Sequence, residues 1–153
     1  MKQYVSSLRQ SRGFTLTELV ILVIMISIIG NALIPKLRQM ELQAMRSEIP
    51  VNLKAIRTAE ISYRNDFGVF VTATAYPATP TSTPQSWVKS ASGGLATLGW
   101  TPEGAVRGSY AVATTTTDFT AYGLSDVDGD GAQATFIATK VHGPKMTTDP
   151  NVY

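Results

Sequence analysis

The spacing of hydrophobic residues changes along the chain and predicts two helical segments followed by a β-rich region. Residues 14–34 are almost uninterruptedly apolar, in the order FTLTELVILVIMISIIGNALI. As a helix this segment is about 31 Å long, which matches a bilayer hydrocarbon core of about 30 Å. The sequence therefore predicts a transmembrane helix over residues 14–34.

From residue 35 to residue 67 the apolar residues recur every three or four positions, as in an amphipathic helix. The predicted apolar face comprises Leu37, Met40, Ala44, Ile49, Leu53, Ile56, Tyr63 and Phe67. The other faces are expected to carry the charged residues Lys54, Arg57, Glu60 and Arg64. This pattern predicts an amphipathic helix that lies on a sheet.

Proline, serine and glycine predict where this helix bends and ends. Pro35 lacks an amide hydrogen and should kink the helix. Ser47 and the nearby Pro50 allow either a second kink or a helix that restarts with Ser47 as its N-cap. Gly68 is the predicted C-terminal stop. We expect a kinked but nearly continuous helix over about residues 14–66.

The remaining residues, 68–153, predict a globular β-rich head. Residues 69–94 are rich in Thr, Ser, Pro and Ala and predict a long surface connection. Alternating patterns predict antiparallel strands within residues 109–116, 118–125 and 132–140. The closing residues, 141–153, read as an irregular tail. Because the amphipathic helix is the one element able to cover the sheet, we predict an α+β fold in which one long kinked N-terminal helix packs on a small antiparallel sheet.

Charge is distributed unevenly between the first residues and the rest of the chain. The formal net charge is +2, and residues 1–13 hold Lys2, Arg9 and Arg12 with no acid. Without them the remaining chain carries 2 − 3 = −1, which gives no electrostatic reason to bind nucleic acid. Glu18 places one carboxylate inside the apolar segment, where insertion costs roughly 2.5–3.5 kcal/mol unless a partner compensates it. A cut before Phe14 would create such a partner, an α-amine.

These features together resemble the prepilin N-terminus of the type IV filament superfamily, which includes type IV pilins and the pseudopilins of type II secretion systems. The residues that carry the resemblance are Gly13, Phe14, Thr15, Leu16, Thr17 and Glu18, with a basic leader before them and an apolar run up to Pro35 after them. The resemblance covers about the first 66 residues and implies a pilin-like fold.

The resemblance also implies a life cycle. Prepilin peptidase would remove leader 1–13 by cutting between Gly13 and Phe14, and Phe14 would then be N-methylated. The chain would sit in the inner membrane as a single-pass protein and be polymerised by an assembly platform there into a helical homo-oligomer, a pilus at the cell surface. In that filament Glu18 would neutralise the Phe14 amine of a neighbouring subunit. Pro35 would end the assembly segment.

An acidic turn, residues 126–131, is the second candidate site. Asp126, Asp128 and Asp130 alternate and Gly131 follows, as at the start of a calcium-binding loop. The twelfth position is Ile137 rather than glutamate, so the complete EF-hand pattern fails. The same residues suit a tight hairpin turn, and both interpretations remain open. Major pseudopilins carry a calcium site in C-terminal loops. Further ligands are expected from Asp118 or Asp149.

The cysteine and histidine content of the chain bears on functions other than that of a structural subunit. The chain has no cysteine, which excludes disulfides and thiolate metal sites, and thereby departs from pilins that close a C-terminal loop with a disulfide. His142 is the single histidine and no catalytic arrangement surrounds it, so we expect no enzyme. The alternatives to a pilus subunit are a pseudopilin of a type II secretion system and a membrane-anchored module that binds calcium or another ligand.

Overall fold

The computed structural model describes residues 13–153, so the leader predicted at residues 1–13, apart from Gly13, lies outside the described residues. The basic residues of that leader, Lys2, Arg9 and Arg12, are among those outside. The backbone divides into two compact units, Met1–Arg38 and Gln39–Tyr153. The described part of the first unit is mostly helical, and the second unit contains the sheet and the helix that packs on it.

Helix α1 spans Leu16–Arg46 and helix α2 spans Glu48–Phe67. One turn residue, Ser47, separates them, and its N–H still donates to the carbonyls of the preceding helical turn at 3.1 and 3.2 Å. The prediction of a nearly continuous helix is therefore confirmed. The alternative of a restart capped by Ser47 is wrong, because Ser47 keeps helical angles (φ −62°, ψ −15°) and its hydroxyl donates back to the Ala44 carbonyl at 2.5 Å.

Pro35 lies inside α1 and does not interrupt it. Gly68 ends α2 as predicted, with φ 80° and an N–H that donates to the Arg64 carbonyl at 2.7 Å. Only glycine adopts this left-handed angle without steric cost. The helix thus ends where the sequence places its stop.

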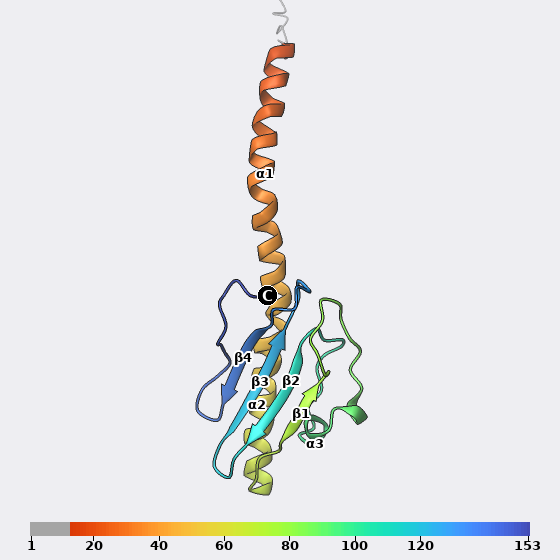
Figure 1. Ribbon diagram of the computed structural model, residues 1–153, viewed down its shortest axis with the longest axis vertical. Coiled ribbons are helices and arrows are strands. Elements are labelled where there is room, and N and C mark those ends of the chain that lie inside the picture. Colours follow the sequence, from red (N-terminus) through yellow and green to blue (C-terminus); the bar gives the residue numbers. More distant parts are fainter. Residues whose placement is uncertain (1–12) are drawn as a thin grey trace, which may run out of the picture. The chain divides into compact units, whose positions relative to one another are not determined.

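The head contains a five-stranded antiparallel sheet with the strand order β1-β2-β3-β4-β5. The strands span Ala73–Tyr76, Ser109–Thr114, Phe119–Ser125, Ala134–Thr139 and Lys145–Met146. Strands β2, β3 and β4 confirm the three predicted strands. A short 3-10 helix, Lys89–Ala91, and helix α3, Gly94–Thr97, lie between β1 and β2. Figure 1 shows the sheet with α2 running behind it.

Both edge strands were missed by the sequence reasoning. Strand β1 lies inside the segment 69–94, predicted as a loop, and β5 lies inside the predicted irregular tail. They have only four and two residues, which is too short for a periodic pattern to emerge. Tertiary pairing defines them instead: Ala73 pairs with Val112, and Lys145 pairs with Ile137.

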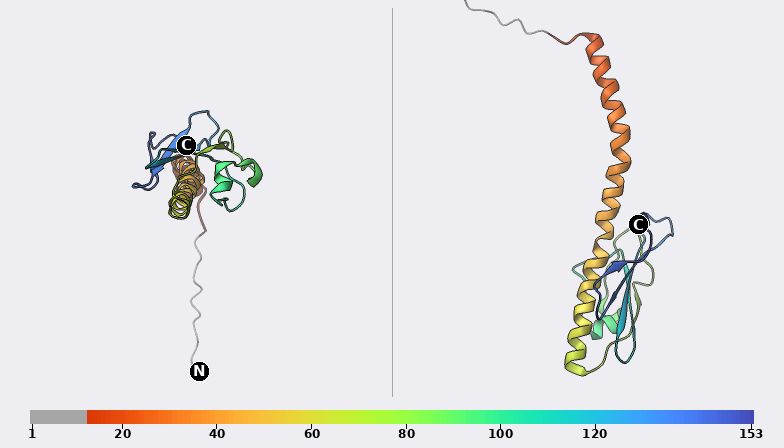
Figure 2. Two further views of the ribbon diagram at one scale, coloured as in Figure 1. Left: turned by 90° about the horizontal axis from the view of Figure 1, so that it is seen from below. Right: turned by 90° about the vertical axis from the view of Figure 1, so that its left-hand side faces the viewer.

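Helix α2 covers one face of the sheet, as the two views in Figure 2 show. Its buried residues are Ile49, Leu53, Ile56 and Glu60. Ile49 approaches β3 so closely that a Cβ at Gly123 would lie 2.5 Å from Ile49 Cγ2. The inner face of β4 is buried at alternate positions, Ala134, Phe136 and Ala138. The predicted packing of an amphipathic helix on a sheet is therefore confirmed.

The predicted apolar face of the helix needs correction at both ends. Leu37, Met40 and Phe67 are exposed, and the buried positions of α2 lie between Ile49 and Glu60. Conversely, Glu60 was expected on a charged face and is fully buried. It follows Ile56 by four positions and therefore falls on the same face as the core residues.

The connection between β1 and β2 is more ordered than predicted, because aromatic rings anchor it. Trp87 packs edge-on against Tyr76 and Trp100, with ring centroids 4.9 and 5.2 Å apart. Trp100 in turn packs against Tyr110 of β2 at 5.5 Å. This cluster packs the connection against β2.

The tail is also fixed to the head. Tyr153 is only 7% exposed, and the Arg46 guanidinium lies 4.8 Å from the centre of its ring. Arg46 also donates to the carbonyls of Pro150 and Val152. The expectation of an irregular tail is wrong at β5, Lys145–Met146, and the last residue, Tyr153, is buried.

Candidate functional site

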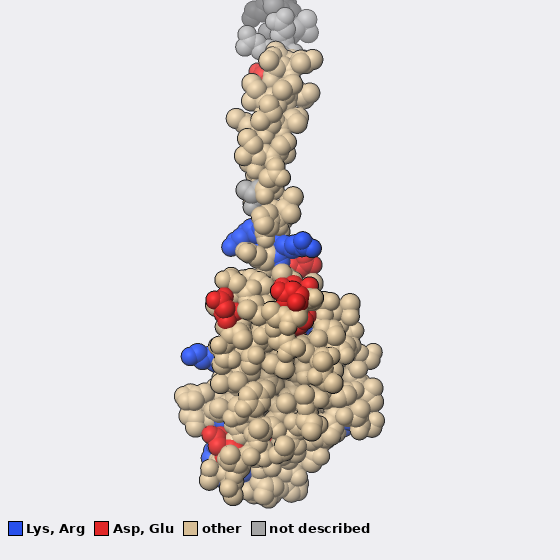
Figure 3. Space-filling model, in the orientation of Figure 1, with Lys and Arg blue, Asp and Glu red and all other residues tan. Residues whose placement is uncertain are grey.

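The first half of α1 is an apolar surface in every direction. Between Leu16 and Ile34 the large apolar side chains are all exposed, from Leu22 at 44% to Leu16 at 81%. The helix is long and apolar enough to cross a membrane, with a mean hydropathy of 2.3 over its most apolar window. Figure 3 shows this part of the helix almost free of charged side chains. Water is a poor solvent for such a surface.

The two polar side chains in the middle of this segment bond to their own helix. The Ser27 hydroxyl donates to the Val23 carbonyl at 2.8 Å, and the Asn31 amide donates to the Ser27 carbonyl at 3.1 Å. The hydroxyl of Ser27 and the amide N–H of Asn31 therefore each have a hydrogen-bond acceptor without water. This is the arrangement expected of a helix that lies in lipid or against other apolar helices.

Thr15 and Glu18 form a capping box at the start of α1. The Glu18 carboxylate accepts hydrogen bonds from the Thr15 N–H and from the Thr15 hydroxyl, both at 2.8 Å. The Glu18 N–H donates to the Thr15 hydroxyl oxygen at 3.3 Å. Reciprocal bonds of this kind satisfy backbone donors that the first helical turn leaves free. Glu18 therefore has a role within its own chain, before any neighbour is considered.

The predicted cleavage site lies immediately before this box. Gly13 and Phe14 precede the helix in irregular structure, and both are exposed, Phe14 at 77%. A Cβ at Gly13 would meet nothing within 4 Å, so packing in the described structure gives no reason for glycine here. The bond between Gly13 and Phe14 is thus held in an accessible, non-helical conformation, which a protease requires.

The acidic turn brings its three predicted residues together. Carboxylate oxygens of Asp126, Asp128 and Asp130 all lie within 4.8 Å of one another, in the connection between β3 and β4. Asp126 accepts the Gly129 N–H at 2.8 Å, and Asp130 accepts the Ala132 N–H at 2.7 Å. These bonds turn the loop as a hairpin requires and still leave oxygen atoms free. Three hard oxygen ligands at this separation suit Ca²⁺, so the turn and the calcium interpretations are compatible.

Neither of the two further ligands joins this cluster. Asp118 lies at the other end of β3 and accepts the N–H groups of Phe119 and Lys140 at 2.8 and 3.2 Å. Asp149 accepts the Asn151 N–H in the tail. Because β3 separates Asp118 from Asp126 by a strand of about 20 Å or more, the expectation that Asp118 completes the site is wrong. Within residues 13–153, Asp149 also stands outside the acidic group.

A polar network between α2 and β2 was not found from the sequence. The Glu48 carboxylate accepts the Tyr110 hydroxyl at 2.9 Å and the Arg107 N–H at 3.2 Å, and the Asn52 amide donates to the same Tyr110 hydroxyl at 2.8 Å. Burial and the nearby Glu48 charge raise the Tyr110 pKa far above its ordinary value of 10.0. This hydroxyl therefore stays protonated and acts as a fixed donor.

Glu60, which was expected on a charged face, is instead fully buried. One carboxylate oxygen accepts the Val71 N–H at 3.1 Å, and the other has no hydrogen-bond partner. Burial raises the pKa of this carboxyl above 4.5. The group links the helix to the start of the β-rich region, and no ligand-binding arrangement surrounds it among the described residues.

Two of these features had a signal in the sequence. The spacing Thr15-x-x-Glu18 is that of a capping box, and Glu60 continues the spacing of Ile49, Leu53 and Ile56. The contacts of Glu48 with Tyr110 depend on tertiary structure and have no local signal. His142 is exposed at the turn that follows β4, with its N–H bonded to the Thr139 hydroxyl.

No protein-family model matches the chain, and neither a curated protein nor a solved structure matches it.

Proposed function

We propose that this chain is a structural subunit of a type IV pilus, cut by prepilin peptidase, N-methylated at Phe14 and assembled through its apolar helix. The observation that carries the proposal is the first half of α1, whose large apolar side chains are exposed on all sides. A surface of this kind must be removed from water, by lipid before assembly and by the helices of other subunits afterwards. The folded head then remains outside the helical bundle.

The capping box gives Glu18 two roles, one within its own chain and one proposed between subunits. In the separate chain its carboxylate is bonded to Thr15, so insertion does not place a bare carboxylate in lipid. In a filament the same carboxylate is available to the Phe14 amine of a neighbour, since a carboxylate has about four acceptor positions. Removing one member of a buried ion pair costs about 3–5 kcal/mol. The pair would therefore fix the register between subunits.

Substitutions can separate capping from charge pairing. Gln at position 18 retains the oxygen that a capping box requires but carries no charge, so Glu18→Gln should insert normally and yield few or no sheared filaments. Thr15→Val keeps the charge and loses the hydroxyl, at a cost of about 0.5–2 kcal/mol to the helix start. Thr15→Val should still form filaments. Normal filament yield from Glu18→Gln would refute charge pairing.

The acidic turn favours a second candidate, a pseudopilin of a type II secretion system that binds calcium. The supporting observation is the convergence of three carboxylates within 4.8 Å. Ca²⁺ should then raise the midpoint of thermal unfolding of the wild-type chain, and Asp128→Ala, which removes the ligand oxygens, should abolish the increase. Glu103→Ala, which removes an exposed carboxylate elsewhere, is the matched control. A secretion defect without surface filaments in a deletion strain would favour this candidate over a pilus.

A third candidate is a membrane-anchored calcium- or ligand-binding module that does not polymerise. It shares the acidic turn and the apolar helix and differs at the N-terminus. A module of this kind would retain its first residues, whereas both filament subunits would begin at Phe14. The mass of the mature chain distinguishes them.

A further inference from the structure

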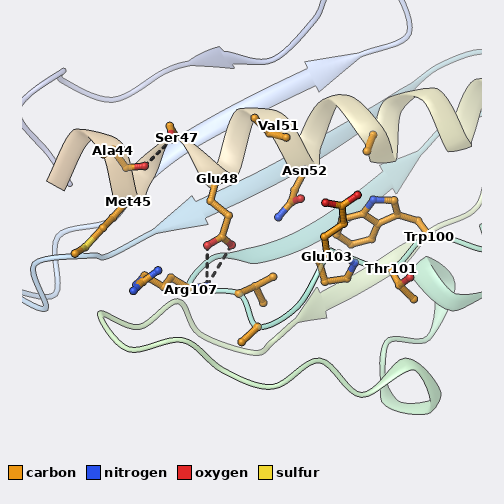
Figure 4. Close-up of a pocket in the computed structure, with 14 residues that line it drawn as sticks. Ala44, Met45, Ser47, Glu48, Val51, Asn52, Trp100, Thr101, Glu103 and Arg107 are labelled. Atoms are coloured by element: carbon orange, nitrogen blue, oxygen red, sulfur yellow. Dashed lines mark hydrogen bonds between the residues drawn. The ribbon is translucent and has the colours of Figure 1, made fainter. Parts of the chain in front are cut away.

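A hollow of about 600 Å³ lies on one flank of the head, between the helix residues 44–55 and the segment 100–107. Figure 4 shows its lining, with Val51 on the helix side and Trp100 and Glu103 on the other. Val51 is 68% exposed although it is apolar, whereas Trp100 is 8% exposed. The hollow therefore presents an exposed apolar side chain, Val51, on its helix wall and an acidic side chain, Glu103, on the opposite wall, with Glu48 and Asn52 also in its lining.

The walls of the hollow are held rigidly. From the helix, the Glu48 carboxylate accepts the N–H groups of Arg107 and Gly108 and the hydroxyl of Tyr110. Arg107, the one cation in the lining, donates from Nε to the Ser82 carbonyl at 3.1 Å. Because both walls are tied to each other, a partner would find this surface already formed, which lowers the entropic cost of binding.

The opposite flank of the head carries a turn of complementary character, residues 140–145, which joins β4 to β5 and includes the first residue of β5. Val141 is 73% exposed at its tip, and the neighbouring side chains Lys140, His142 and Lys145 are also exposed. An exposed valine flanked by two lysines is the counterpart of a surface on which an exposed valine, Val51, lies near an acidic side chain, Glu103.

This turn is also held from behind. The Arg57 guanidinium of α2 donates to the carbonyls of Thr139 and Lys140 at 2.8 and 2.7 Å. The Asp118 carboxylate accepts the Lys140 N–H at 3.2 Å, and the Thr139 N–H donates to the His142 carbonyl at 2.9 Å. The backbone of the turn is thus fixed, and Val141 projects from it without being required for the core.

We propose that the 140–145 turn of one copy docks in the hollow of a second copy, with Val141 against Val51 and with Lys140 and Lys145 near Glu103. The two surfaces lie at opposite ends of the strand order, the turn beside β5 and the hollow on the β1–β2 side, where Gln85 bridges Val106. A contact between two different surfaces of identical chains leaves one of each surface free, so it propagates from copy to copy, and it gives a helical array when the rotation between copies does not close a ring.

This inference rests on the proposed filament and specifies which parts of the heads meet in it. The chain has no cysteine, so introduced cysteines report one contact only. The full-length double variant Val51→Cys with Val141→Cys is produced in cells that make filaments, and the sheared filaments are oxidised. Disulfide formation requires Cβ atoms about 3.5–4.5 Å apart. We expect a ladder of covalent multimers on a non-reducing gel from this variant and none from either single variant.

Matched variants make the result specific. Val69→Cys with Val141→Cys uses another exposed valine (59% exposed) and should give no ladder. Glu103→Lys should reduce the ladder about tenfold, and adding Lys140→Glu should restore it. Filaments that form normally but give no ladder, or only dimers, would overturn this inference and leave the proposed function standing. Absence of filaments from the wild-type chain would refute the proposed function itself.

Discussion

The packing of α2 on the sheet can be tested by a double-mutant cycle that measures the free energy of unfolding of variants at Gly123 and Ile49. A Cβ at Gly123 would lie 2.5 Å from Ile49 Cγ2, against 3.4–4 Å for ordinary contact. Ile49 is 1% exposed and cannot move away into solvent. Gly123→Ala should therefore destabilise the head by about 1–3 kcal/mol, as overpacking does in other cores.

Removing the other partner should relieve this clash. Ile49→Ala alone should cost about 2–5 kcal/mol because it leaves a cavity. In the double variant the alanine at position 123 enters space that Ile49 has left, so the combined loss should be smaller than the sum by about 0.5–3 kcal/mol. The magnitude of this coupling measures how closely the helix approaches the strand.

The assay is urea unfolding of the full-length chain in detergent, followed by the fluorescence of Trp100, which lies in the core, and of Trp87, which packs against it. Gly143→Ala is the control, because a Cβ there would meet nothing within 4 Å, and it should change the free energy of unfolding by less than about 0.5 kcal/mol. Losses that add within about 0.5 kcal/mol would show that Ile49 does not lie against Gly123, which would refute the packing described here.

Further predictions concern the buried polar groups. Because burial raises the Glu60 pKa above 4.5, the folded chain holds a proton that the unfolded chain has lost. The free energy of unfolding should therefore fall as the pH rises from 4.5 through the folded pKa, and Glu60→Gln should remove this dependence in urea titrations at several pH values. Tyr110→Phe should lower the free energy of unfolding by about 1–3 kcal/mol, because it leaves Glu48 and Asn52 without their shared partner. Adding Asn52→Ala to this variant should lower it little further, because the bond of Asn52 to Tyr110 is already lost.

The helical half of the fold was predictable because its signals are local. An uninterrupted apolar run, a three-to-four residue spacing and Gly68 define the helix without knowledge of the rest of the chain. The strands β2, β3 and β4 were predictable for the same reason, since alternation over six or seven residues is visible in the sequence.

The missed features depend on contacts between distant residues. Strands β1 and β5 exist through pairing with β2 and β4. The Trp87 cluster orders a segment whose composition is typical of a loop. Glu60 was assigned to a charged face because of its type, although its spacing places it on the core face. In these cases contacts between distant residues, and not residue type or short-range pattern, determine the local structure and the burial.

For the candidate sites, the sequence located the residues but not their local bonds. Asp126, Asp128 and Asp130 converge as predicted, while Asp118 serves a different turn at the far end of β3. Glu18 was predicted from its charge within the apolar segment and from the resemblance of the N-terminus, and the structure adds its bonds to Thr15. The role proposed for Glu18 in a filament requires a neighbouring chain and stays a prediction.

The most direct measurement is the intact mass of the chain recovered from filaments sheared from cells that express the complete sequence. We predict a single species that starts at Phe14 and carries one added N-methyl group, with no trace of residues 1–13. Recovery of filaments is itself part of the prediction. A chain that is found only in the membrane fraction and still begins at Met1, in cells with an active prepilin peptidase, would contradict the account.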